Sequence, residues 1–216
     1  YRCEFLNERA FALIRLGEYG EAEHCVRAVT ERILDPAAAG ELARAQSNYG
    51  VIAMRRGDWE AAHQSFEAAL AGYRMVNDRL GMARTLNNLG LMEKNRGDSE
   101  RAIRYAKSAL EVSEDVGDTY LVGTHLTNLG LYEFKVGEWD DARNHWERAA
   151  RLLEGIGNKW EVANVELNLG NYYRHKRDLE EAGAHYDRAR VIVEELGEAR
   201  ELVLVKEFQG DLAFSS

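Results

Sequence analysis

The sequence predicts an all-α protein, an α-solenoid in which about five helix hairpins follow one another along the chain. Three observations predict this fold class. Short marks of the form Asn-x-Gly and Gly-Asp recur every 40 residues. Proline occurs once, at Pro36, so long helices are not interrupted, and no segment carries strand signals. A repeat of this length cannot bury its apolar face alone, and neighbouring repeats therefore stack.

The marks stand at the same place in every repeat. The glycines of the Asn-x-Gly mark are Gly50, Gly90, Gly130 and Gly170, and a later small residue recurs as Ala62, Ala102, Ala142 and Ala182. The first repeat is degenerate, because Glu8 and Ala10 take the places of the asparagine and the glycine. The predicted repeats cover about 1–38, 39–78, 79–118, 119–158 and 159–198, within a single domain 1–216.

The two ends of the chain follow from the same pattern. Apolar residues at helical spacing predict a helix over about 3–16, ended by Gly17, and a second over about 19–34, closed by Pro36. Gly210 marks a capping helix, 199–216, that covers the open end of the stack. Alternatively, the natural chain continues there, and a first residue other than Met, Tyr1, favours a fragment of a longer protein.

Glycine in the middle of a helix costs about 1 kcal/mol relative to alanine. Its recurrence in every first helix indicates that another helix approaches so closely that a Cβ atom would block it. In the hairpin turn, Gly57, Gly97 and Gly137 each end a first helix, and the acid that follows caps the second. Arg177 replaces this glycine in the last hairpin, where we expect a longer or slightly strained turn.

Composition excludes several classes of function. The formal net charge of -9 argues against nucleic acid as the main ligand, since phosphate binding needs a basic field. No apolar run approaches the roughly 20 residues of a membrane helix, so no membrane partner is expected. Cys3 and Cys25 lack metal-ligand spacing and suit a reducing compartment, from which a cytoplasmic location follows.

No pattern of catalytic residues is present. The six histidines form no zinc motif, and no glycine-rich phosphate loop occurs. We therefore expect no enzyme activity, no metal and no cofactor.

The marks together resemble the tetratricopeptide repeat. Leu89 and Gly90 match the first-helix pair of that family, Ala102 and Ala109 its small positions, and a second-helix aromatic recurs as Phe66, Trp146 and Tyr186. The unit of 40 residues, without a closing proline, is similar to the long-helix variety of kinesin light chains, Pins-type adaptors and sensor regions of bacterial regulators. The resemblance implies a right-handed superhelix whose first helices line a concave groove that binds a peptide or a helix of a partner.

Carrying the groove positions of the family over to this chain gives a set of candidate partner-binding residues. They are Arg44, Asn48, Arg55, Arg84, Asn88, Lys94, Asn128, Lys135, Asn168, Asn171 and Arg174, with Thr127, Leu131, Asn164 and Leu167 among those between them. This set contains cations and no acid, which favours an acidic partner segment or a free carboxylate. The alternative is that the cations pair with acids of the scaffold or are solvated.

The asparagines at 48, 88, 128 and 168 have two interpretations. A row of amides can hold the backbone of an extended peptide, or each amide can bridge neighbouring helices inside the scaffold. Asn171 resembles the asparagine of carboxylate-clamp members of the family, but Val51, Leu91 and Leu131 stand at the matching places, so a full clamp is doubtful.

Three functions remain open at this point. The first is a non-catalytic scaffold that binds a partner protein. The second is a sensing domain, for an effector or a peptide, within a larger transcription regulator or signalling ATPase. The third is self-assembly through the terminal helices, since the sequence does not indicate an oligomeric state.

Overall fold

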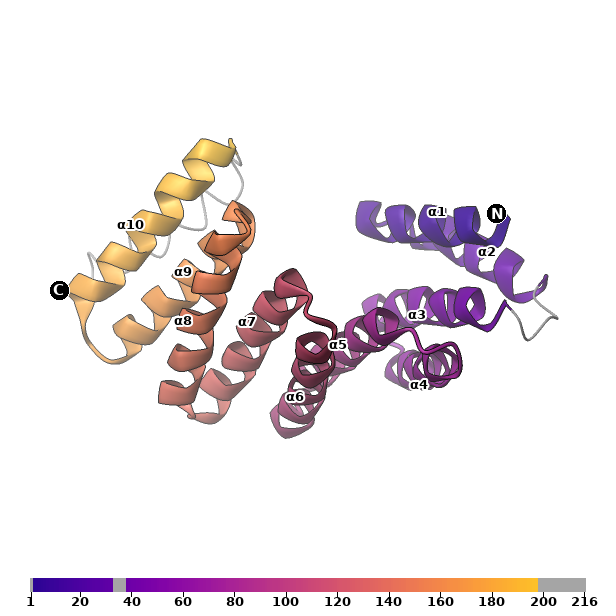
Figure 1. Cartoon of the computed structure of the whole chain (residues 1–216), viewed down its shortest axis with the longest axis horizontal. Coiled ribbons are helices and arrows are strands. Elements are labelled where there is room, and N and C mark those ends of the chain that lie inside the picture. The colour runs from indigo at the N-terminus through magenta and orange to yellow at the C-terminus, as the bar shows by residue number, and fades with distance from the viewer. Residues whose placement is uncertain (1, 33–37, 198–216) are drawn as a thin grey trace. The chain divides into compact units, whose positions relative to one another are not determined.

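A computed structural model describes residues 2–32 and 38–197. Within these ranges the chain is entirely helical, with ten helices and no strand (Figure 1). The helices are α1 (Arg2–Leu16), α2 (Tyr19–Thr30), α3 (Ala39–Arg55), α4 (Trp59–Met75), α5 (Arg79–Arg96), α6 (Ser99–Val116), α7 (Thr119–Val136), α8 (Trp139–Gly155), α9 (Lys159–His175) and α10 (Leu179–Leu196).

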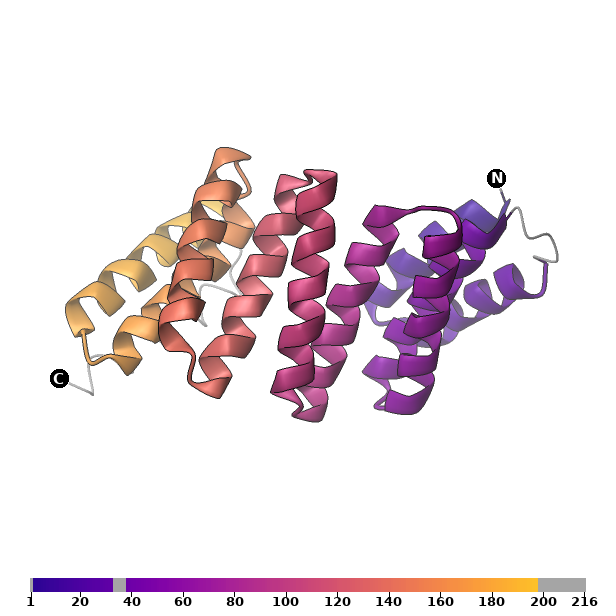
Figure 2. The ribbon, with the colours of Figure 1, turned by 60° about the horizontal axis from the view of Figure 1, so that its bottom comes forward.

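The chain divides into two compact units, 1–116 with α1 to α6 and 117–216 with α7 to α10. Inside each unit successive helices pack on one another, and the two helices of each hairpin run side by side (Figures 1 and 2). This is the arrangement of an α-solenoid, as the repeat predicts. The single domain and the right-handed superhelix expected from the sequence remain predictions. Pro36 and the capping helix 199–216 lie outside the described residues.

Three of the hairpins, α3–α4, α7–α8 and α9–α10, close on a contact between a glycine and an aromatic ring. A Cβ atom added to Gly50 would lie 2.6 Å from the Phe66 ring, and one added to Gly130 would lie 2.7 Å from Nε1 of Trp146. Gly170 is blocked in the same way by Tyr186. All three rings are almost fully buried. The mid-helix glycines therefore allow the close approach that the sequence predicts, and the group that comes close is the second-helix aromatic.

The turn at Arg177 has the same length as its glycine counterparts. Its φ angle is 66°, in the left-handed region occupied by Gly57, Gly97 and Gly137 in the earlier hairpins. A residue with a Cβ pays roughly 1–2 kcal/mol for this conformation. The strained turn that the sequence predicts is therefore present, without the longer connection.

Several helix starts follow the predicted capping chemistry, but Glu18 and Glu138 form no side-chain cap. The side chains of Asp58, Asp118 and Asp178 each accept a hydrogen bond from the backbone N–H three residues later. The second helix was predicted to extend to about residue 34, but α2 ends at Thr30, whose hydroxyl donates to a carbonyl of its own last turn.

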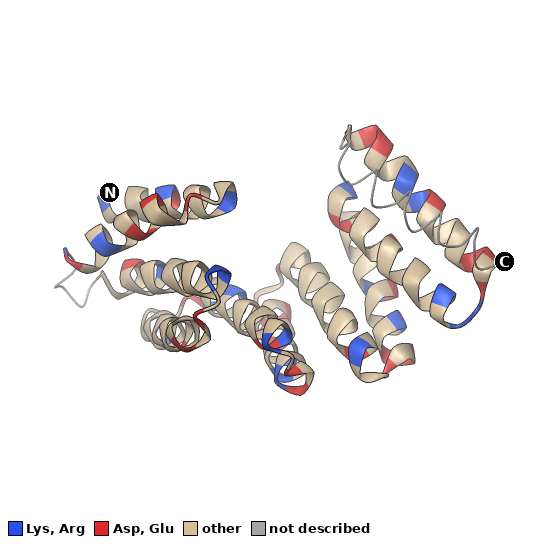
Figure 3. Cartoon of the chain, turned by 180° about the vertical axis from the view of Figure 1, so that it is seen from behind, with Lys and Arg blue, Asp and Glu red and all other residues tan. Residues whose placement is uncertain are grey.

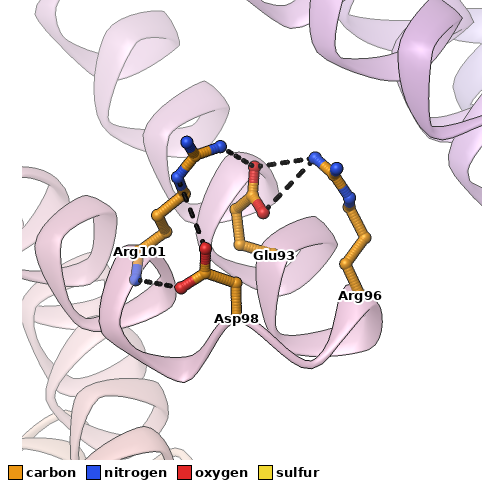
Figure 4. A network of polar contacts seen from close by, with 4 residues as sticks. All are labelled: Glu93, Arg96, Asp98 and Arg101. Atoms are coloured by element: carbon orange, nitrogen blue, oxygen red, sulfur yellow. Dashed lines mark hydrogen bonds and ion pairs between the residues drawn. The ribbon is translucent and has the colours of Figure 1, made fainter.

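Buried acids form a second set of contacts within the hairpins. Glu93 is 1% exposed and lies between the guanidinium groups of Arg96, at 3.3 Å, and Arg101, at 3.9 Å (Figure 4). Glu133 occupies the same place one repeat later and meets Nδ1 of His145 at 2.6 Å. The carboxylates thus have charged or polar partners where water is excluded, as a buried charge requires.

In the last hairpin the buried acid comes from a different turn of the first helix. Tyr173 stands at the repeat position of Glu133 and stacks on His185, with ring centroids 5.1 Å apart. The carboxylate is supplied by Glu166, which contacts His185 at 2.7 Å and Arg188 at 2.8 Å. Burial raises the pKa of Glu166, but the hydrogen bonds and charges of these two partners outweigh it and hold that pKa below its usual value.

We predict opposite effects for two glycine substitutions in the same hairpin. Gly170→Ala forces a Cβ against the Tyr186 ring and should destabilise the fold by roughly 1–3 kcal/mol. Gly183→Ala, in α10, meets no atom within 4 Å and should stabilise it by up to about 1 kcal/mol. Urea unfolding of both variants measures the difference, and a Gly170→Ala protein as stable as the natural one would contradict the close contact.

We also predict a stability effect that depends on pH. Because the folded pKa of Glu166 is depressed, its carboxylate stabilises the fold above the usual value of 4.5, and this contribution is lost as the pH falls through the folded pKa. Glu166→Gln should therefore lower the free energy of unfolding at pH 7, by roughly 1–3 kcal/mol, and the gap to the natural protein should narrow below pH 4.5.

The control for this prediction is Glu194→Gln, also in the last hairpin. Glu194 forms an exposed pair with Arg190, and its loss should change stability by less than about 1 kcal/mol. Thermal or urea unfolding between pH 3 and 7 tests both variants. A gap for Glu166→Gln that does not change with pH would argue against the ion pair.

Candidate functional site

A cavity of about 310 Å³ lies between the first helices of the two hairpins of the second unit, α7 and α9. Its volume is in the range of small ligand sites. The residues that line it are mainly short and polar, with two leucines. They are Thr127, Asn128, Leu131, Glu161, Asn164, Leu167, Asn168 and Asn171.

The structure brings together here most of the groove residues predicted for this unit. Asn128, Asn168 and Asn171 all line the cavity. The side chain of Asn168 makes no hydrogen bond to other described residues, and neither does that of Asn164. An amide carries both donors and an acceptor, so these side chains can bind the N–H and C=O groups of an extended chain.

The orientation of Asn171 is set by the hairpin itself. Its Oδ1 atom accepts a hydrogen bond of 2.9 Å from the hydroxyl of Tyr186. Tyr186 is the same ring that packs against Gly170. A residue of the cavity wall is therefore held by the contact that closes the hairpin.

The predicted site residues of α3, in the first unit, are largely engaged in the scaffold. Asn48 is 8% exposed and donates from Nδ2 to the backbone carbonyl of Asn7, at 3.2 Å. Arg44 pairs with Glu8 at 2.7 Å. Of the two interpretations of the asparagine row, the structure shows the bridge between helices at position 48.

The other predicted residues of the first unit have no such partners. Arg55 and Arg84 are exposed, Asn88 and Lys94 are half-buried, and none of the four side chains makes a hydrogen bond or ion pair with another described residue. Arg84 and Lys94 both lie on α5, ten residues apart, which places them about 15 Å apart along the helix and about 80° apart around it. The two cations of α5 can therefore meet one ligand.

The predicted cations of the second unit do not line the cavity. Lys135 is exposed and Arg174 is half-buried, both in the last turn of their helices. Figure 3 shows α7 largely free of charged residues, whereas α10 carries both signs. In this unit the cavity wall thus lacks the basic character that the groove positions indicate.

An aromatic cluster lies at the same end of these helices. His175, at the end of α9, meets the ring of Trp139 at 4.2 Å and that of Phe134 at 5.6 Å between centroids. The Tyr172 hydroxyl donates to Asp140, which lowers the pKa of that carboxyl, as does the nearby Lys176. These contacts join successive hairpins of the second unit next to the cavity.

One lining residue, Glu161, was missed at the sequence level. The carried-over positions begin one turn later, at Asn164, and were therefore free of acids. A signal was present, since 161, 164, 168 and 171 are spaced by three or four residues and share one face of a helix. Following that face back by one turn reaches the carboxylate.

The described ranges, 2–32 and 38–197, hold neither a metal cluster nor a membrane-spanning helix. No group of three or more His, Cys, Asp or Glu side chains there is placed to hold a metal ion. None of the described helices combines the length and apolar character needed to cross a bilayer.

Solved structures with similar folds cover nearly the whole chain. The apo form of RapI is 14% identical, with a TM-score of 0.84 over 98% of this chain and 77% of RapI. A signal transduction ATPase with numerous domains from Pyrococcus horikoshii, which has a tetratricopeptide repeat sensor, is 16% identical, with a TM-score of 0.83 over 94% of this chain and 31% of the ATPase.

A third structure, a Rap protein complexed with competence and sporulation factor, is 15% identical. Its TM-score is 0.78, over 94% of this chain and 57% of the Rap protein. This chain thus spans less than two thirds of two of the three proteins. At these identities the likeness concerns the fold.

Comparison of the sequence itself gives the family. No curated protein sequence matches the chain. One family model described as tetratricopeptide repeat matches residues 41–115 and 121–190, more than half of the chain, and a second model with the same description matches residues 7–74. The chain therefore belongs to the tetratricopeptide repeat family.

Proposed function

We propose that this protein is a non-catalytic scaffold that binds a segment of a partner protein along its first helices. The observation that carries the proposal is the cavity between α7 and α9, with the amides of Asn164 and Asn168 at its wall. Polar groups in a wall bind a ligand more strongly when no neighbour already occupies them. An extended peptide offers alternating donors and acceptors, which suit a wall of amides.

The cations of the first unit support a preference for acidic segments. Arg84 and Lys94 on α5, with Arg55 on α3, make no ion pair with a described acid, on a chain whose formal net charge is -9. A local positive field on an acidic protein attracts carboxylates and repels basic ligands. The acidic part of a partner is therefore proposed to bind at α5.

A second candidate function is a sensing domain within a larger protein. The Pyrococcus horikoshii ATPase is described as having a tetratricopeptide repeat sensor, and this chain spans 31% of it. The natural gene discriminates the two functions, because a nucleotide-binding or DNA-binding domain next to this segment would favour sensing.

We predict that the amides of the cavity contribute directly to peptide binding. Peptides are selected from a random 12-residue library on the immobilised chain, and their affinities are measured by fluorescence anisotropy. Asn168→Ala should weaken binding roughly threefold to tenfold, since a net hydrogen bond contributes about 0.5–1.5 kcal/mol. Asn144→Ala, an exposed asparagine of α8, is the matched control and should leave affinity unchanged. Equal loss in both variants, or no selected peptide, would count against the proposal.

A separate prediction concerns the cations of α5. The double variant Arg84→Glu, Lys94→Glu should reduce binding of selected peptides that contain Asp or Glu, and the reduction should shrink as salt is added. The double variant Arg104→Glu, Lys107→Glu, at two exposed cations of the second helix α6, controls for the equal change in net charge. If the double variant and the control bind acidic peptides equally well, α5 is not the site of contact.

A further inference from the structure

The cavity of the second unit contains one charged side chain. Glu161 is half-buried and lies in the first turn of α9, where its backbone N–H donates to the Asn158 side chain. Its carboxylate forms no ion pair with a described residue. A partly buried carboxylate without a partner pays a desolvation cost that a bound cation would offset.

Glu161 is aligned with the amides of the cavity. Glu161, Asn164, Asn168 and Asn171 lie on one face of α9, and ten residues of helix cover about 15 Å. An extended peptide rises about 3.3 Å per residue, so roughly four or five residues cover the same length. The carboxylate therefore lies at one end of a row of amides that matches a short peptide segment.

Apolar surface is available beside the row. Leu131 on α7 and Leu167 on α9 both line the cavity. Lysine and arginine bury their aliphatic stems on such surface while their charged heads reach a polar group. The lining thus offers a contact for each part of a long basic side chain.

We propose that this cavity selects a peptide segment that places a lysine, an arginine or an amino terminus against Glu161. The inference rests on the proposed function and adds the chemistry of the ligand at this cavity. It is opposite in sign to the preference proposed for α5, and the two are tested with different variants. In this arrangement Asn164 and Asn168 bind the backbone of the peptide, and Glu161 selects a positively charged group on it.

The test uses three libraries of seven-residue peptides, each with its central residue fixed as arginine, glutamine or glutamate and the others random. Each is incubated at low salt with the immobilised full chain, natural at Glu161 and carrying Arg84→Gln and Lys94→Gln so that the α5 cations do not retain acidic peptides, and retained peptides are quantified by mass spectrometry. We expect the arginine library to be retained roughly tenfold more than the glutamate library. Raising the salt concentration should reduce this ratio.

Two variants isolate the carboxylate. Glu161→Gln should abolish the preference for arginine, while Glu181→Gln should keep it. Glu181 holds the same place in α10, since its backbone N–H is capped by Asp178 as that of Glu161 is by Asn158. Any general effect of losing an acid in the first turn of a helix therefore occurs in both variants. A difference between them reports on the cavity, which Glu161 lines and Glu181 does not. Unfolding curves establish that both variants are folded.

Charge reversal gives an outcome that loss of folding cannot imitate. Glu161→Lys should shift retention toward the glutamate library, and Glu181→Lys should not. If the chain natural at Glu161 retains the libraries equally, or if Glu161→Gln keeps the preference, the inference is wrong while the proposed function stands. If the chain natural at Glu161 retains none of the three libraries, both are wrong.

Discussion

The close packing of a glycine against an aromatic ring is the contact on which three of the described hairpins depend, α3–α4, α7–α8 and α9–α10. At Gly50, Gly130 and Gly170 the missing Cβ admits Phe66, Trp146 and Tyr186, in that order. The helix loses about 1 kcal/mol of intrinsic stability at each glycine. Burying a ring of this size returns more, because aromatic side chains each remove roughly 150–250 Å² from water. The ring also fixes the distance between the helices, and thereby the face that the first helix presents.

The polar contacts of the buried acids differ from one hairpin to the next. Glu93 pairs with two arginines, Glu133 with a histidine, and Glu166 with both kinds of partner. A buried carboxylate needs a partner, but the partner can come from several positions on the facing helix. The hairpins therefore differ in their polar interiors, even where, as in α7–α8 and α9–α10, they share the glycine–aromatic contact.

The regular part of the fold could be predicted from the sequence because it rests on local rules. Glycines at fixed spacing end helices, acids cap them, and apolar stripes face neighbouring helices. The sequence alone therefore predicts that Gly97 ends a helix and that Asp118 caps one. The family match agrees with the resemblance found from these residues. The left-handed conformation of Arg177 was also foreseeable, because this residue stands at the repeat position of the glycines that end the earlier first helices.

The candidate site was less predictable because it depends on contacts between distant residues. Asn48 and Asn168 hold equivalent positions, yet the first bonds to a carbonyl of α1 and the second lines a cavity. Spacing alone cannot separate these outcomes, since they depend on what the neighbouring helix offers. Glu161 lies one turn before the family's groove positions on the same face of α9, and the cavity that it lines with the asparagines forms only where α7 packs beside α9.

The hydrogen bond from Tyr186 to Asn171 affects which ligand groups can bind to Asn171. Tyr186 occupies one acceptor site of the amide oxygen, and no described residue accepts from the NH₂ group of Asn171, which can therefore donate to a bound acceptor such as a backbone carbonyl. The rotamer is chosen when the protein folds, so little side-chain entropy remains to be lost on association. Folding thus pre-organises the NH₂ group of Asn171 as a hydrogen-bond donor in the cavity wall.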